Sequence, residues 1–282
     1  MRRVLAALDC SLAAKPVLAV ARALGEVLGA DVAALHVQAD SARTLRVLAR
    51  AAGVPLRVVH GGVVERLVAA GGADDIAALV IGARGIPGDP RPLGATAVAV
   101  ATTMLKPVVV VSPDADPHPT INRALVPLEG DISTSLAPQP LIELAPDVGL
   151  EVIALHVVQP EAIPAFTDQP QHEQEARAQE FLARYCPWGI DVVRFETRVG
   201  RREELVPLAA REYGCDLIVL GWLQRLTPGR ARVVRATLER SRVPVMLVPI
   251  SSTEADRPAQ GGPKTLTSRA DVPDDGSDRH AA

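Results

Sequence analysis

The feature that most constrains the fold of this chain is an internal repeat. Residues Ala34–Val37 spell Ala-Leu-His-Val, and the same four residues recur at Ala154–Val157, an offset of 120 positions. Farther along, Gly61–Glu65 corresponds to Gly200–Glu204, where the offset has grown to 139 positions. One insertion in the second copy, placed between residues 159 and 179, explains the change. A chain repeated in this way is expected to fold as two copies of one unit.

Each copy alternates short β-branched runs with longer segments of helical period, which is typical of βαβ units and a parallel sheet. The expected strands of the first copy are Arg3–Leu8, Asp31–Gln38, Leu56–His60, Ala78–Ile81 and Val108–Ser112. Those of the second copy are Arg123–Pro127, Glu151–Val158, Asp191–Thr197, Leu217–Leu220 and Val245–Val248. Helices are expected at Ala14–Leu28, Gln171–Tyr185, Arg202–Tyr213 and Arg232–Arg242, among others. The predicted fold class is therefore α/β, with two tandem, doubly wound, mainly parallel five-stranded sheets.

The last strand of each copy is an uninterrupted apolar run, Val108–Val111 in the first and Val245–Val248 in the second. A flat apolar strand at a sheet edge invites aggregation, because its backbone groups are unpaired. Pairing these two strands with each other removes that hazard. We expect the copies to join along them as an intramolecular pseudo-dimer, and further assembly into a homodimer stays open.

Composition shifts divide the chain into three parts. The predicted domains are 1–116 and 117–250, one for each copy. From Ser251 onward Gly, Pro, Ser, Asp and Arg dominate without an apolar period. Such a segment cannot bury enough surface to offset the entropy of ordering, so 251–282 is predicted to be a disordered tail.

Composition also excludes several function classes. The formal net charge is -3 and aromatic residues make up 2% of the chain, so neither a general basic field nor many stacking rings are present for nucleic acid. Every apolar run is broken by charge, Gly or Pro well before the roughly 20 residues that span a bilayer. The cysteines Cys10, Cys186 and Cys215 are odd in number and widely spaced, which argues against a disulfide framework or a zinc site. A soluble protein of a reducing cytoplasm is expected.

Four features recur in order in both copies: an acidic residue ending the first strand, Leu-His-Val ending the second, a glycine after the fourth, and a Pro-led valine-rich last strand. In the first copy they are Asp9, Leu35–Val37, Gly82 with Gly85, and Pro107–Val111. In this order the chain resembles the universal stress protein family, whose UspA-like domains share the adenine-nucleotide α-hydrolase-like fold. The resemblance implies a stress-responsive protein whose copies pair through the last strand.

Family members that bind ATP carry Gly-x2-Gly-x9-Gly-Ser/Thr between the fourth strand and the last helix. Glycines allow the backbone to approach phosphates, and a helix N-terminus offers free N–H groups to them. Here the corresponding residues are Gly82, Gly85, then Gly94 or Ala95, and Thr96. The resemblance adds Asp9 and the backbone of Val37, which would meet the ribose and adenine. These seven residues form the predicted ATP and Mg²⁺ site, although the same loop can be a plain strand-to-helix turn and Asp9 can simply cap a helix.

The second copy departs from that pattern. Gln224 stands where the second glycine should be, Val234 and Arg235 replace the Gly-Ser/Thr pair, and Glu129 replaces the strand-end aspartate. No standard ATP site is expected there. A basic run consists of Arg225, Arg230, Arg232, Arg235, Arg240 and Arg242. It is expected to be a solvated helix face, or else a surface for an anion or acidic partner.

The function that the resemblance implies is a stress-responsive, nucleotide-linked regulatory or sensor protein. The alternative is an interaction scaffold of the same fold that has lost nucleotide binding. No nucleophile, base and orienting group stand at motif spacing, so a dedicated enzyme is not expected, and ATP hydrolysis would at most be slow. His36 and His156 lie inside apolar strands and are expected to make structural hydrogen bonds.

Overall fold

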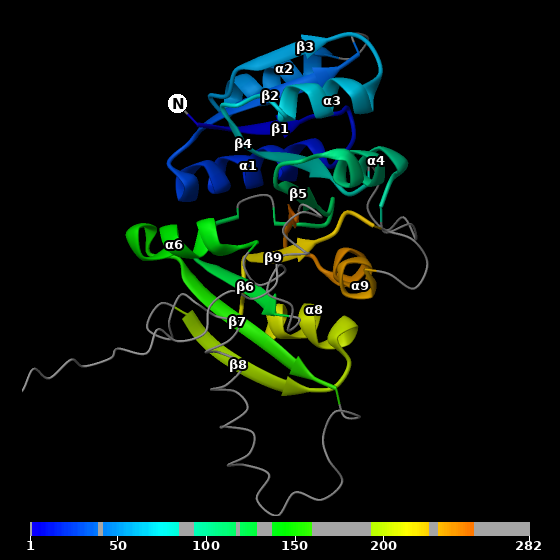
Figure 1. Ribbon diagram of the computed structural model, residues 1–282. Helices are drawn as coiled ribbons and strands as arrows, with labels where there is room; N and C mark the ends of the chain where they lie inside the picture. Colours follow the sequence, from blue (N-terminus) through cyan, green and yellow to red (C-terminus); the bar gives the residue numbers. More distant parts are fainter. Residues whose placement is uncertain are drawn as a thin grey trace, which may run out of the picture.

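Ten strands form one continuous sheet in the computed structural model, in the order β3-β2-β1-β4-β5-β10-β9-β6-β7-β8. The structure describes residues 2–38, 42–84, 93–116, 119–128, 137–159, 193–225 and 231–250. The order is symmetric about the β5–β10 junction, so each copy of the sequence repeat contributes five neighbouring strands. Figure 1 shows the first copy (blue to green) stacked above the second (green to orange).

The elements of the first copy follow one another as predicted. They are β1 (Arg3–Ala7), α1 (Ala14–Leu28), β2 (Asp31–Val37), α2 (Ala42–Ala51), β3 (Leu56–Val59), α3 (Val63–Gly71), β4 (Ile76–Gly82), α4 (Ala95–Thr103) and β5 (Val108–Val111). The predicted α1 is confirmed to the residue, and it ends at Gly29, whose φ of 56° is left-handed. The fourth strand is longer than the predicted Ala78–Ile81, since it also includes Ile76 and Ala77 before that segment and Gly82 after it.

The second copy repeats this order. Its described elements are β6 (Arg123–Leu128), α6 (Gln139–Val148), β7 (Glu151–Val158), β8 (Val193–Val199), α8 (Arg202–Glu212), β9 (Leu217–Trp222), α9 (Arg232–Arg240) and β10 (Val245–Pro249). The predicted helix Gln171–Tyr185, Cys186, the start of the strand from Asp191, the proposed insertion and the tail 251–282 lie outside the described residues.

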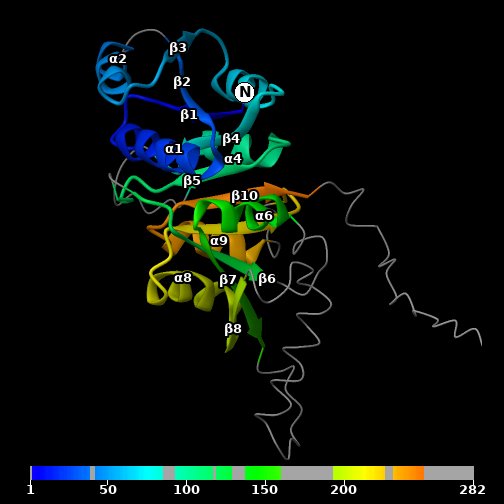
Figure 2. The ribbon, with the colours of Figure 1, turned by 90° about the vertical axis from the view of Figure 1, so that its left-hand side faces the viewer.

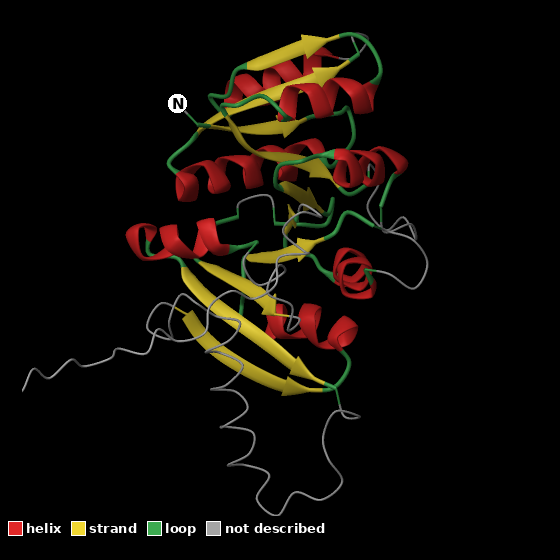
Figure 3. Cartoon of the chain, viewed as in Figure 1, coloured by secondary structure: helices red, strands yellow, loops and turns green. Residues whose placement is uncertain are grey.

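Helices cover both faces of the sheet, as the red and yellow elements of Figure 3 show. One core cluster packs side chains of α1, α2 and α6 against one face, and a second cluster packs α3, α4, α8 and α9 against the other. Neighbouring residues of β1 divide between the clusters: Val4 and Ala6 face the first, and Leu5 faces the second. The strands are buried on both sides, which explains why they are continuously apolar rather than alternating.

The two copies meet at an antiparallel pair in the middle of an otherwise parallel sheet. β10 pairs with β5 in the register Val245↔Val110, Met246↔Val109 and Leu247↔Val108. These side chains are all buried, with Val109 and Met246 at 0% and 4% exposure. Figure 2 shows the two strands side by side between the copies. The expected pairing of the last strands is therefore confirmed.

Candidate functional site

A change in chain direction marks one place at the carboxyl edge of the first copy's strands. From β1 the chain moves outward through β2 and β3, then crosses back to β4 and β5 on the other side of β1. In open α/β sheets, ligands bind at the carboxyl ends of strands where the order reverses in this way. The point lies between β1 and β4, which are parallel neighbours.

A cavity of about 410 Å³ opens at that point. Its walls come from the ends of β1, β2 and β4, the turn before α1, and the first turns of α3 and α4. Cavities of about 300 to 1,000 Å³ are usual for small-molecule sites. The cavity is therefore large enough to take up a ligand such as a nucleoside.

Four of the seven predicted site residues line this cavity, namely Asp9, Val37, Gly82 and Thr96. Two others adjoin it: Gly94 is the N-cap of α4, and Ala95 is the first residue of that helix. Gly85 lies outside the described residues. The fold thus brings together six residues that are spread over more than 80 positions of the chain.

Val37 projects its peptide groups toward the cavity because of its place in the ladder. The N–H of Gln38 donates to the Val59 carbonyl of β3 at 2.8 Å, and that of Ala34 donates to Pro55 at 2.8 Å. Since alternate residues of a parallel strand bond to opposite neighbours, the N–H and C=O of Val37 point toward β1. The last β1–β2 pair is Ala7↔Leu35, so Val37 lies two residues beyond it.

Asp9 takes part in a local turn. The Ser11 N–H donates to Asp9 Oδ1 at 3.1 Å, and the Ser11 hydroxyl donates to the same oxygen. Ser11 Oγ in turn accepts the Ala13 N–H at 3.2 Å just before α1. Asp9 therefore does not cap α1 itself, and its Oδ2 has no hydrogen-bond partner among the described residues.

Gly82 and Gly94 of this site differ in why a glycine stands there. A Cβ on Gly82 would lie 3.0 Å from Ala13 Cβ, so the end of β4 must be small for α1 to approach it. A Cβ on Gly94 would meet only the Ala83 carbonyl at 3.6 Å, an ordinary contact. Gly94 instead contributes its N–H, which donates to that carbonyl at 2.7 Å and ties the start of α4 to β4.

The start of α4 faces the cavity without a side-chain cap. The first N–H groups of a helix lack intrahelical partners, and the helix dipole makes them attractive to anions. Thr96 adds an exposed hydroxyl to this end of the helix, and Ala97 beside it lines the cavity. This arrangement can accept a phosphate group.

His36 is held by the main chain in the way the sequence predicted. Its Nδ1 lies 2.8 Å from the Leu8 carbonyl, which can only accept, so Nδ1 carries the proton in this bond. His156 is the equivalent residue of the second copy, 28 residues after Leu128 as His36 is 28 residues after Leu8. Burial lowers the pKa of His156 below the ordinary value, and this outweighs the opposite influence of the Leu128 backbone.

Cys10 and Gln38 are two of the lining residues that the predicted site did not include. Cys10 follows Asp9 in the same turn, and Gln38 follows Val37 at the end of β2. Gln38 has a φ of 94°, in the left-handed half of conformational space that residues with a side chain rarely adopt. Proximity to Asp9 and Val37 was the only sequence signal for either residue.

The loop after β9 in the second copy takes a different role. Gln224 occupies the position of the missing glycine and keeps a left-handed φ of 56°. Its Nε2 donates to the Met104 carbonyl at 2.6 Å and reaches the Ala101 carbonyl at 3.4 Å. The residue therefore contacts the C-terminal end of α4 in the first copy. Val234, which replaces the glycine at the helix start, is buried in the core, whereas Glu129 lies outside the described residues.

The basic run is partly tied to α8. Arg232 pairs with Glu203 at 3.6 Å, and Arg240 donates to the Glu203 carbonyl at 3.5 Å. Arg225, Arg235 and Arg242 are exposed, and Arg230 lies outside the described residues. This pattern favours a solvated helix face.

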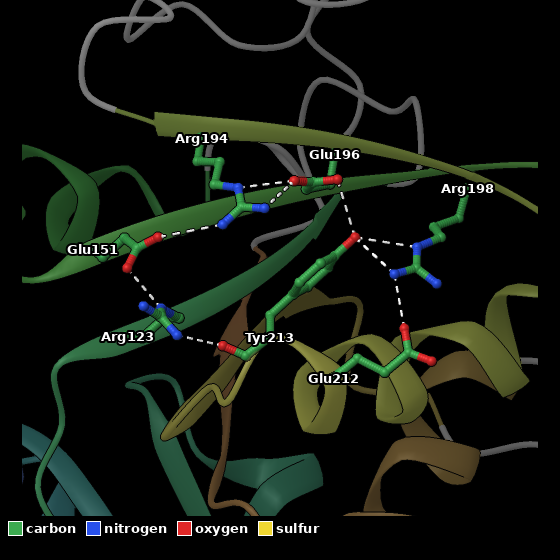
Figure 4. Close-up of polar contacts among 7 residues, drawn as sticks. All are labelled: Arg123, Glu151, Arg194, Glu196, Arg198, Glu212 and Tyr213. Carbon is green, nitrogen blue, oxygen red and sulfur yellow. Dashed lines mark hydrogen bonds and ion pairs between the residues drawn. The ribbon is translucent and has the colours of Figure 1, made fainter.

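A second polar cluster lies on β6, β7 and β8 near the end of α8 (Figure 4). Tyr213 donates its hydroxyl to Glu196 at 3.0 Å and accepts from Arg198 at 2.9 Å, while the guanidinium carbons of Arg194 and Arg198 lie 5.3 and 5.1 Å from its ring centre. Arg123 pairs with Glu151 at 2.6 Å, and Glu212 pairs with Arg198 at 2.8 Å. Each charge in the cluster has an opposite partner, so the cluster joins the edge strand to α8 and leaves no charge for a ligand.

No group of three or more His, Cys, Asp or Glu side chains in the described part of the chain is placed to hold a metal ion. No helix among the same residues is both long and apolar enough to cross a membrane.

Comparison with known proteins agrees with this fold. A universal stress protein from Archaeoglobus fulgidus matches with a TM-score of 0.63 and 16% identity over 89% of this chain and 97% of that one. A functionally unknown protein from Pseudomonas aeruginosa matches with a TM-score of 0.61 and 15% identity over 89% and 93% of the two chains. At these identities the likeness shows the fold alone, across both copies.

A search of curated proteins found no sequence match. The model of the universal stress protein family, in contrast, matches residues 120–249, most of the second copy. The second copy is thus similar to the universal stress protein family in sequence, and the whole chain shares the fold of a member of that family.

Proposed function

We propose that the first copy binds an adenine nucleotide, as ATP with Mg²⁺, in the cavity between β1 and β4. The observation that carries this proposal is the position of Val37. Its N–H and C=O point toward β1 beyond the last β1–β2 pair, at the wall of a cavity of about 410 Å³. A neighbouring donor and acceptor of this kind match N1 and the amino group on the Watson–Crick edge of adenine.

The other groups of the cavity suit the rest of such a ligand. Asp9 offers a carboxylate oxygen that is suited to ribose hydroxyls or to a magnesium ion. The uncapped start of α4 and the Thr96 hydroxyl suit a phosphate. The proposal concerns binding, and with it a stress-responsive regulatory or sensor role in which nucleotide occupancy is the signal.

Calorimetric titration with ATP and Mg²⁺ tests the proposal. Thr96→Val keeps the shape of the side chain and removes its hydroxyl, so we expect about a tenfold loss of affinity for one charge-assisted hydrogen bond. Thr103→Val is the matched control, because Thr103 is exposed at the opposite end of the same helix. Gly82→Val is a poor test, since its Cβ would already crowd Ala13. Absence of binding by the parent protein at millimolar ATP would refute the proposal.

The second candidate is an interaction scaffold without a nucleotide. Gln224 favours this function for the second copy. In place of the glycine that would approach a phosphate, it has a side chain that hydrogen-bonds to the end of α4 and so joins the two copies. A scaffold would bind its partner with the same affinity with and without ATP. Pull-down of cellular partners with and without ATP therefore separates the two functions.

A further inference from the structure

The backbone of Gln38 is unusual for its residue type, and it lies at the wall of the candidate site. Its φ of 94° is one of three positive values at non-glycine residues within the described ranges. Glycine adopts this conformation freely, and asparagine and aspartate tolerate it better than glutamine does. Unfavourable backbone conformations persist mainly where surrounding structure or function requires them.

The peptide N–H of Gln38 is already hydrogen-bonded within the sheet. This N–H donates to the Val59 carbonyl at 2.8 Å, so this peptide group belongs to the β2–β3 ladder and is not available to a ligand. The side chain is exposed and the residue lines the cavity. The carboxamide is therefore the group that Gln38 can offer there.

The order of Val37 and Gln38 matches the order of hydrogen-bonding groups around adenine. Val37 would meet N1 and one hydrogen of the 6-amino group. A glutamine carboxamide pairs with the other edge of the base, donating to N7 and accepting from the second amino hydrogen, as in the glutamine–adenine pairs of DNA recognition. Guanine presents two acceptors, O6 and N7, on that edge, so a carboxamide cannot form the same pair with it.

We propose that Gln38 is a base-specificity residue, whose carboxamide reads the N6/N7 edge of a bound adenine and selects adenine over guanine nucleotides. This inference rests on the proposed nucleotide site. It also explains why a residue that tolerates the left-handed backbone poorly stands at this position.

The test compares ATP, 7-deaza-ATP and GTP on the parent protein, Gln38→Gly and Gln38→Asn. 7-Deaza-ATP replaces N7 by carbon and so removes one acceptor of the proposed pair. The parent should bind ATP about tenfold or more tightly than 7-deaza-ATP, and more tightly still than GTP. Gln38→Gly should bind ATP and 7-deaza-ATP equally, while its melting temperature is unchanged or higher because glycine suits the backbone.

Gln38→Asn keeps a carboxamide in a residue that tolerates positive φ, and it should restore part of the discrimination between ATP and 7-deaza-ATP. Three outcomes are informative. Equal binding of ATP and 7-deaza-ATP by the parent overturns the role of Gln38 and leaves the nucleotide site standing. The same discrimination in Gln38→Gly as in the parent also overturns it. Absence of ATP binding by the parent overturns the nucleotide site itself.

Discussion

Replacement of Gln224 by Ala or Gly measures what holds the two copies together beside the β5–β10 pair. Gln224 Nε2 donates to two carbonyls in the last turn of α4, at 2.6 Å to Met104 and 3.4 Å to Ala101. Both acceptor residues are buried, with exposures of 1% and 2%. Terminal helix carbonyls have no intrahelical partner, so this side chain supplies one across the interface.

The expected loss in free energy of unfolding follows from these two hydrogen bonds and from the backbone conformation of Gln224. Leaving a buried carbonyl unsatisfied costs about 1 to 3 kcal/mol, so Gln224→Ala should lower the free energy of unfolding by that amount. The φ of 56° adds a second contribution. A side chain in the left-handed conformation costs about 1 kcal/mol relative to glycine, so Gln224→Gly should lose about 1 kcal/mol less than the Ala variant.

Equilibrium denaturation followed by far-ultraviolet circular dichroism and by tryptophan fluorescence gives both values. Trp222 is buried at 3% exposure two residues from the substitution and reports on the second copy. Gln139→Ala is the control, since Gln139 is only partly buried and its hydrogen bond is to Glu143 on the same helix. The free energy of unfolding of this variant should fall by no more than about 0.5 kcal/mol. An Ala variant as stable as the parent, or a Gly variant less stable than the Ala variant, would show that the contact or the backbone conformation has been misjudged.

Three other predictions follow from the described core. Gly25→Ala in α1 should destabilise the protein by about 1 to 3 kcal/mol despite the higher helix propensity of alanine, because its Cβ would lie 2.8 Å from Val32 Cγ2 and 2.9 Å from the Ala30 carbonyl oxygen; a stabilised variant in thermal unfolding would contradict this. Burial lowers the pKa of His156 below 6.5, so its contribution to stability is complete above about pH 6.5 and is lost as the pH falls toward the lowered pKa. His156→Gln should therefore show a shallower fall in unfolding free energy than the parent between about pH 7.5 and about pH 5, and parallel curves would refute the assignment. Burial also raises the pKa of the Cys215 thiol to about 11, so peptide mass spectrometry should find Cys215 unmodified by iodoacetamide in the native protein at neutral pH and modified once it is unfolded.

The candidate site could be predicted in part. Asp9, Gly82 and Thr96 were named from the order of motifs and Val37 from the resemblance to the universal stress protein family, and the fold places all four on one cavity. Three of these residues lie at or just after strand ends, where ligand sites of parallel sheets are found, and strand ends are marked by where apolar runs stop. Gln38 was missed because nothing in its residue type indicates a left-handed backbone. Its N–H nevertheless stays in the β2–β3 ladder, bonded to the Val59 carbonyl.

The roles of individual polar residues were also beyond the sequence. Asp9 could have capped α1, but in the structure Ser11 occupies its Oδ1 and bonds to Ala13 instead. Gln224 looked like a lost glycine, whereas its side chain contacts a helix 120 residues earlier in the chain. Such contacts depend on how two segments far apart in the chain pack against each other, and the spacing of residues within a motif does not specify that packing.

The sequence by itself determined that this chain is an α/β repeat, because the hydrophobic period of each short segment specifies strand or helix and the duplicated motifs specify the order twice over. The expected pairing of the last strands did not specify its direction or register, and only the tertiary structure decided that it is antiparallel with Met246 opposite Val109. The tertiary structure also decided which residues line the cavity and that Gln224 of the second copy contacts α4. The physical reason is range: periodicity records which side of a segment is buried, whereas register and contact between segments more than 100 residues apart depend on the packing of the whole molecule.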